Sequence, residues 1–168
     1  MTAISHNFDY YKTSSDFDVY KTSTDAVLDK FKTGKMYLEN REQYFAMILS
    51  VCNHFKQGIV NVESSLNKVI TDCHACSSNY SEAVDSVYEV FDLFEEYVDF
   101  ICKDFLDFKE AVISVIPQES LEYRCSIDFN LVEQRVTNLH EMLSRVRSQL
   151  LSRFISKLSD SELHARAV

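Results

Sequence analysis

Two cysteines and a histidine, Cys73, His74 and Cys76, form the most metal-like cluster in this chain of 168 residues. A structural zinc ion needs four such ligands, which usually come from two pairs at a suitable spacing. The next pair, Cys52 and His54, lies upstream on the same predicted helix and is poorly placed to converge with the first. We therefore predict that the cluster belongs to the helix core or a turn, and that no metal is bound.

Catalytic chemistry finds no better arrangement of residues. The histidines are scattered, without a serine or cysteine nucleophile and an acid at a recognisable spacing: His6, His54, His74, His140 and His164. A phosphate-binding loop needs several glycines, and only Gly34 and Gly58 are present. The acidic residues of 82–110 do not occur in the Glu-x-x-His pattern of di-iron bundles. We predict no catalytic residue and no cofactor, and we expect that the protein is not an enzyme.

A stripe of apolar residues along the chain predicts the helices that would position any functional surface. It runs from Phe45 to Tyr80 and from Val84 to Val115 at alternating steps of three and four residues, which predicts long helices packed side by side. An additional step of four falls at Tyr80, beside Asn79 and Glu82, which have the spacing of a capping box. This favours a turn at 77–79, and one continuous helix with a stutter is the alternative.

The expected elements are three helices over about 24–74, 80–116 and 127–158. Pro117 ends the second helix because it lacks an N–H and clashes with the preceding turn, and Ser126 or Asp128 would cap the third. A flexible arm over 1–22 precedes the helices, and a frayed tail over 161–168 follows them. We predict an all-α bundle of three long antiparallel helices with coiled-coil-like packing.

The N-terminal arm contains a tandem repeat with a period of nine residues, Phe8–Asp16 and Phe17–Asp25. This period fits neither a heptad nor a solenoid, so we interpret it as a local duplication in a flexible arm. The alternative is a partner-binding or phosphorylated motif that is presented twice. The candidate phosphate acceptors are Thr13, Ser14, Ser15, Thr22, Ser23 and Thr24.

Charge is distributed unevenly along the chain, whose formal net charge is −9. Such an acidic protein is a poor general binder of nucleic acid. The second predicted helix is acidic and the third is basic, so we expect the two to lie side by side, within one chain or between subunits. The alternative for the basic helix is contact with an anionic membrane or an acidic partner. The residues that would make this contact are Arg145, Arg147, Arg153 and Lys157.

Surplus apolar residues on the second helix, Tyr88, Tyr97 and Phe100, widen its apolar side beyond a two-stranded seam. They are the candidate protein interface. The chain has no transmembrane run and no pattern of a signal peptide, and its odd number of cysteines is typical of free thiols in a reducing compartment. We expect a cytoplasmic adaptor or scaffold subunit that self-associates, as a homodimer, and takes no small-molecule substrate.

Three long helices behind a short arm resemble the BAR superfamily of membrane-curving dimers. The residues Val19-Tyr20-Lys21-Thr22, Phe31, Gly34-Lys35-Met36-Tyr37 and Tyr44-Phe45 are similar to the first helix of its inverse-BAR branch. The resemblance implies an antiparallel dimer that binds or senses curved membranes, with the arginines of the third helix as lipid contacts. The chain departs from the family in being shorter and in carrying a strongly acidic second helix.

Overall fold

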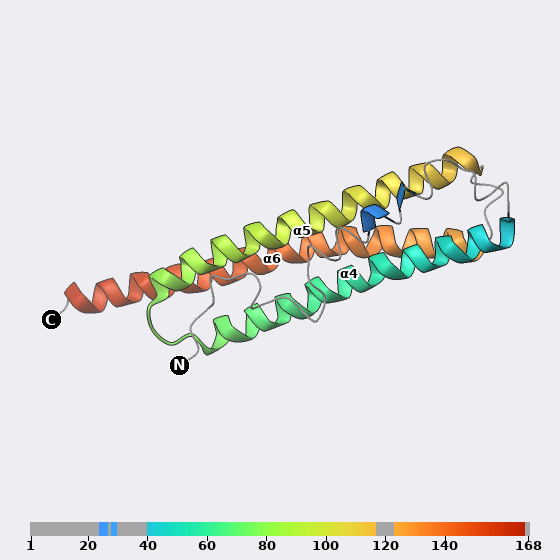
Figure 1. Cartoon of the computed structure of the whole chain (residues 1–168). Coiled ribbons are helices and arrows are strands. Elements are labelled where there is room, and N and C mark those ends of the chain that lie inside the picture. Colours follow the sequence, from blue (N-terminus) through green and yellow to red (C-terminus); the bar gives the residue numbers. More distant parts are fainter. Residues whose placement is uncertain (1–23, 27, 30–39, 117–122, 167–168) are drawn as a thin grey trace.

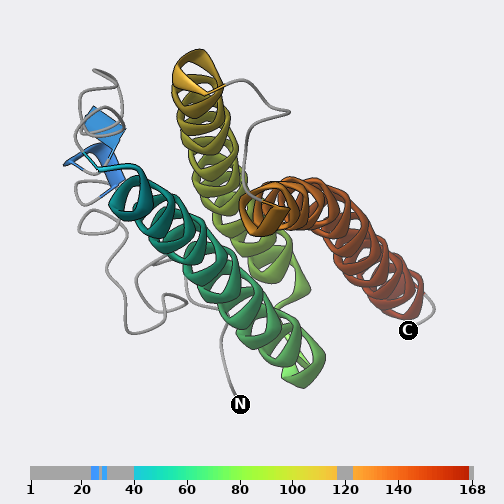
Figure 2. The same cartoon turned by 90° about the vertical axis from the view of Figure 1, so that its right-hand side faces the viewer.

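Three long helices pack lengthwise against one another and form an all-α bundle, as predicted (Figure 1). The computed structural model describes residues 24–26, 28–29, 40–116 and 123–166. Helix α4 spans Arg41–Ala75, α5 spans Tyr80–Val115 and α6 spans Tyr123–Arg166. Helix α5 runs antiparallel to both neighbours, so α4 and α6 run in the same direction (Figures 1 and 2).

Helix α4 begins later than the expected helix over 24–74. Asn40 precedes it in an extended conformation, with φ −155°, and its side chain accepts a hydrogen bond of 3.1 Å from the backbone N–H of Gln43. This side chain satisfies one of the N–H groups that a helix start leaves unpaired. Asn40 therefore interrupts the single helix that was expected from residue 24, and residues 24–26 and 28–29 are also helical.

The predicted break between the first two long helices is confirmed, although its chemistry differs from a capping box. Asn79 adopts the left-handed conformation, with φ 54°, which asparagine tolerates better than most residues. Its side chain makes no capping bond to the backbone, and instead its amide donates to the carboxylate of Glu82. The spacing of the two residues thus brought their side chains together without producing the predicted reciprocal cap.

Helix α6 is longer than the expected helix over 127–158 at both ends. It begins at Tyr123, so the predicted caps Ser126 and Asp128 lie inside it, and it continues to Arg166 into the predicted frayed tail. Asp128 instead forms an ion pair of 2.9 Å with Lys56 of α4. The side chain of Asp128, which was predicted to cap the helix, therefore makes a tertiary contact instead.

Aromatic rings fill the core where the three helices meet. Phe55 of α4 lies 5.5 Å from Phe105 and 6.0 Å from Phe108 of α5, measured between ring centroids. Phe129 of α6 lies 6.1 Å from Phe105 and 5.6 Å from Phe108. Edge-on and tilted rings at these distances attract one another beyond the burial of their surface. This cluster therefore ties all three helices together at one level of the bundle.

Candidate interaction surfaces

A row of ion pairs follows the contact between α5 and α6. Arg147 lies 2.9 Å from both Asp92 and Glu95. Further along, Lys109 lies 2.8 Å from Glu133 and His140 lies 3.6 Å from Asp99. The prediction that the basic helix lies beside the acidic one is confirmed, and the pairing occurs within one chain.

The four basic residues proposed to contact a membrane or an acidic partner do not share one open face. The guanidinium of Arg147 is held by two carboxylates and also stacks over the ring of Tyr88, at 5.3 Å from its centroid. Arg153 is half-buried and donates to the backbone carbonyl of His74. Arg145 and Lys157 are exposed, and neither forms an ion pair within the described residues. Two of the four side chains are therefore engaged inside the bundle.

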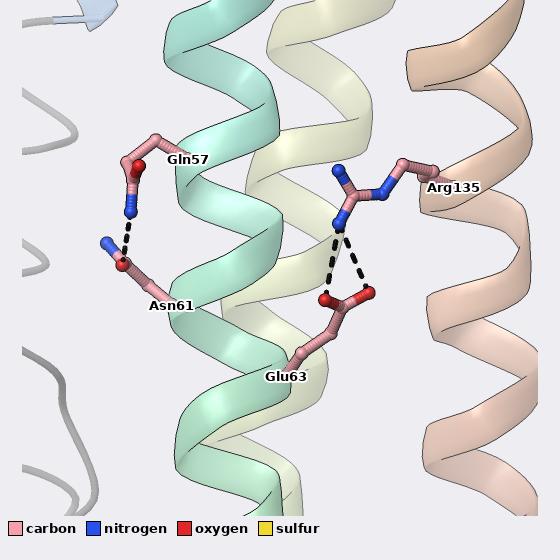
Figure 3. Close-up of polar contacts among 4 residues, drawn as sticks. All are labelled: Gln57, Asn61, Glu63 and Arg135. Carbon is pink, nitrogen blue, oxygen red and sulfur yellow. Dashed lines mark hydrogen bonds and ion pairs between the residues drawn. The ribbon is translucent and has the colours of Figure 1, made fainter.

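A second set of ion pairs joins α4 to α6. Lys56 pairs with Asp128 at 2.9 Å, and Arg135 lies 3.2 Å from Glu63 across the two helices (Figure 3). Val60 and Leu131 lie one helical turn from these pairs, Ile127 precedes Asp128, and all three side chains stay exposed. A groove of about 350 Å³ is lined by Leu49, Asn53, Ile127 and Asp128. We call Leu49, Val60, Ile127 and Leu131 the outer strip.

The predicted protein interface on α5 is only partly at the surface. Tyr97 is 4% exposed and belongs to the core, so its assignment to a surface was wrong. Phe100 is half-buried against the core, and Tyr88 is 45% exposed beneath Arg147. Helix α5 packs against both α4 and α6, and this requires apolar side chains on two flanks. Some of the surplus apolar residues of α5 therefore pack against a second helix of the same chain.

Polar side chains are buried between α4 and α5. Asn61 and Ser65 lie one turn apart on α4, and Ser86 and Tyr97 lie on one face of α5. Burial raises the pKa of Tyr97 to about 12, and the nearby Asn61 side chain opposes this shift with a smaller effect. On the far side of α4 from Arg135, Gln57 donates to Asn61 at 3.1 Å (Figure 3). We call this contact the α4–α5 seam. It contains buried polar side chains, whereas the core of the bundle is apolar.

Two residues of the described N-terminal segment, Thr24 and Leu28, pack beside α4 and α5. Thr24 is buried, with its hydroxyl 2.7 Å from Nε2 of His54 on α4. Leu28 is also buried and lines, with Phe108 and Ala111 of α5, a cavity of about 360 Å³. Among the candidate phosphate acceptors, Thr24 is thus enclosed by the fold. The other candidates lie outside the described residues: Thr13, Ser14, Ser15, Thr22 and Ser23.

The cysteines that formed the candidate metal cluster are separated by the end of α4. Cys73 is buried in the core, where burial raises its pKa to about 12. Cys76 lies past the helix end, and its thiol donates to the carbonyl of Ser78 at 3.2 Å. Burial likewise raises the pKa of Cys52 to about 12, and a protonated thiol is a poor nucleophile. Within the described residues, no group of three His, Cys, Asp or Glu side chains could hold a metal ion.

Comparison with protein-family models, with curated proteins and with solved structures found no match to the chain. The resemblance to the BAR superfamily therefore stays a prediction. Within the described part of the chain, no helix combines the length and apolar content needed to cross a membrane.

Proposed function

We propose that the protein is a non-enzymatic helical interaction module that self-associates and acts as an adaptor or scaffold subunit. The observation that carries this proposal is the set of large apolar side chains that remain exposed although the core of the bundle is filled. They occur on all three helices: Val60, Tyr88, Leu93, Leu106, Ile127, Leu131 and Ile155.

The arrangement of these side chains supports a contact surface. Single exposed apolar residues are normal on any protein, whereas grouped ones mark interaction sites. Val60 on α4 and Leu131 on α6 each lie one turn from an ion pair that joins these two helices, and Ile127 of α6 lines a groove with Leu49 of α4. The outer strip and the C-terminal part of α6 around Ile155 are therefore the two candidate surfaces for association.

Long helices that pack lengthwise suit a scaffold because they present extended faces instead of a cleft. Two of the fully buried cysteines, Cys52 and Cys73, are held as protonated thiols, and this favours a structural role for them. The alternative, a BAR-like membrane-binding dimer, would require an open basic face. The pairing of Arg147 with Asp92 and Glu95 gives that alternative less support.

Solution scattering coupled to size-exclusion chromatography tests the proposal, because it gives mass and shape together. We expect a particle of two chains, longer than it is wide, whose mass decreases on dilution. A particle of single-chain mass at every concentration up to hundreds of micromolar would contradict self-association.

Vesicles that contain anionic lipid test the membrane alternative in the same buffer. For an interaction module without a lipid surface, we expect no co-sedimentation with them. Salt-sensitive binding that is lost on replacing both Arg145 and Lys157 by glutamate would favour the membrane function instead.

A further inference from the structure

Charge is distributed unevenly around the outside of the bundle. On α5, the exposed charged positions are eight acids and one lysine: Glu82, Asp85, Glu89, Asp92, Glu96, Asp99, Asp107, Glu110 and Lys103. On α4, the outward stripe from residue 46 to residue 71 follows steps of four and three residues and carries no charge: Ala46, Ser50, Asn53, Gln57, Val60, Ser64, Asn67 and Thr71. Lys68 lies one heptad after Asn61 and therefore faces the α4–α5 seam instead. The bundle thus combines an acidic side on α5 with an uncharged stripe on α4.

The uncharged stripe continues onto α6. The two ion pairs between α4 and α6 both join residues that are 72 apart in the sequence, which fixes the register of the two helices. Because α4 and α6 run in the same direction (Figure 1), Val60 and Leu131 lie level with each other between these pairs. The next outward positions of α6, Gln134 and Asn138, are also exposed and uncharged. We call the α4 stripe together with Leu131, Gln134 and Asn138 the uncharged face.

This distribution of charge suits contact between two copies of the chain. Each copy carries a formal net charge of −9, so most approaches of one copy to another bring acidic surfaces together, and like charges in contact are strongly disfavoured. Contact through the uncharged face instead leaves the acidic side of each α5 on the outside of the pair. At the usual spacing of packed helices, the two α5 helices are then more than about 20 Å apart. This exceeds the Debye length of ~8 Å at physiological salt, so their repulsion is screened.

The area of the uncharged face matches what a specific dimer needs. The register places Tyr123, where α6 begins, level with Val51, so the two helices lie side by side as far as Ala75. This overlap is about 37 Å long and about 18 Å wide at usual helix dimensions. Two copies would therefore bury roughly 1,300 Å² in total, which is above the ~1,000 Å² expected of a biological interface. Val60 and Leu131, which are 42% and 41% exposed, lie well inside this area.

The composition of the uncharged face resembles that of an interface. Its two large apolar side chains, Val60 and Leu131, are surrounded by amide, hydroxyl and small side chains. Association sites commonly have such an apolar centre within a polar rim from which charged residues are depleted. The charged residues nearest to the centre already form ion pairs between α4 and α6. A partner therefore meets few charges that it would have to neutralise.

We infer that a second copy of the chain covers the uncharged face of α4 and α6. A two-fold axis brings Val60 and Leu131 of one copy against the same two residues of the other, so that each contact occurs twice. The inference rests on the proposed self-association and names its surface, in preference to the C-terminal part of α6 around Ile155.

Sedimentation velocity of the full chain over a concentration series tests this surface. Leu131→Asp and Val60→Asp each place a charge at the centre of the contact, and we expect each to raise the dimer dissociation constant at least about tenfold. The matched control is Leu106→Asp, which makes the same change at a leucine of α5 that is 44% exposed. We expect this control to change the dissociation constant by less than about threefold, with circular dichroism confirming that the variants are folded.

The salt dependence of the unchanged chain gives a second readout that needs no variant. Because the uncharged face carries no opposite charges to pair across the contact, the dissociation constant should stay constant or decrease as sodium chloride is raised from about 0.05 M to about 0.5 M. A dissociation constant that rises steeply with salt would overturn the inference, because it would mean that opposite charges hold the two copies together.

The variants also distinguish this surface from the other candidate. A dimer weakened by Ile155→Asp, and not by Leu131→Asp or Val60→Asp, would overturn the inference and place the contact at the C-terminal part of α6. A dimer that none of the variants weakens would also overturn it, while self-association itself stands. A chain that is monomeric throughout would overturn both proposals and leave the uncharged face to a partner of another kind.

Discussion

The two contacts that α5 makes with its neighbours are built on different principles. Between α5 and α6, apolar side chains fill the interior, and charged pairs follow the edge at Arg147 and Lys109. Between α4 and α5, polar side chains such as Asn61 and Tyr97 are themselves buried, and farther along α4 the buried Thr24 contacts His54.

The difference shows how one helix can distinguish two partners. Exposed ion pairs contribute little stability but disfavour a wrong partner or register, because like charges would then face one another. Buried polar groups cost free energy unless they are hydrogen-bonded. We therefore expect the stability of the α4–α5 contact to depend on Thr24 and Leu28, which pack beside it, more than the stability of the α5–α6 contact depends on any single charge.

Removal of the ring at Phe108, where both contacts converge, should have the largest effect. Phe108 is fully buried against Phe55 and Phe129, so Phe108→Ala should lower the free energy of unfolding by about 3–5 kcal/mol. Urea denaturation followed by circular dichroism measures this loss. The control Leu106→Ala changes a side chain that is 44% exposed and should cost much less. Equal losses in the two variants would mean that the aromatic cluster does not hold the helices together.

Alkaline pH should weaken the α4–α5 seam through Tyr97. Its pKa is raised from 10 to about 12 in the folded protein, so the folded state retains a proton that the unfolded state loses. The stability due to this group is complete below pH 10 and is lost as the pH rises through 12. Between these values the free energy of unfolding should fall less steeply for Tyr97→Phe than for the unchanged chain. The exposed Tyr88 provides the control, and a Tyr88→Phe variant with the same flattened profile would refute this explanation.

Loss of one hydroxyl should measure how firmly Thr24 is held against α4. Thr24→Val keeps the shape of the side chain and removes the group that lies 2.7 Å from His54, which should cost about 1 kcal/mol. Amide hydrogen exchange in α4 around His54 should become faster because residue 24 is held less firmly against the helix. Thr137→Val, at an exposed site on α6, should leave this exchange unchanged. Unaltered exchange in Thr24→Val would show that the hydroxyl does not protect this part of α4.

The charged edge of the α5–α6 contact should give the smallest effect. Arg147→Ala removes two partly exposed ion pairs and the contact with Tyr88, and should cost about 1 kcal/mol at low salt. High salt should reduce this difference because it screens exposed charges. Arg145→Ala, two residues away, should have no measurable effect. A loss at Arg147 that is insensitive to salt would instead indicate a packing role for the side chain.

The candidate surfaces could be predicted from sequence only where a local rule applied. The charge of α6 against α5 predicted their pairing, because opposite charges on neighbouring helices attract whatever the details of the fold. Tyr97 was assigned to a surface because the apolar width of α5 is equally consistent with an outside partner and with a second neighbour in the chain. The outer strip was missed because Leu49 of α4 and Ile127 of α6 line one groove only once α4 lies beside α6.

The sequence by itself determined the helical fold and the break near residues 77–79. These follow from apolar spacing and backbone conformation, which act over a few turns. Tertiary structure decided which carboxylates Arg147 meets and that Asp128 pairs with Lys56 instead of capping α6. These outcomes depend on residues distant in sequence, whose contacts form only once the helices are packed.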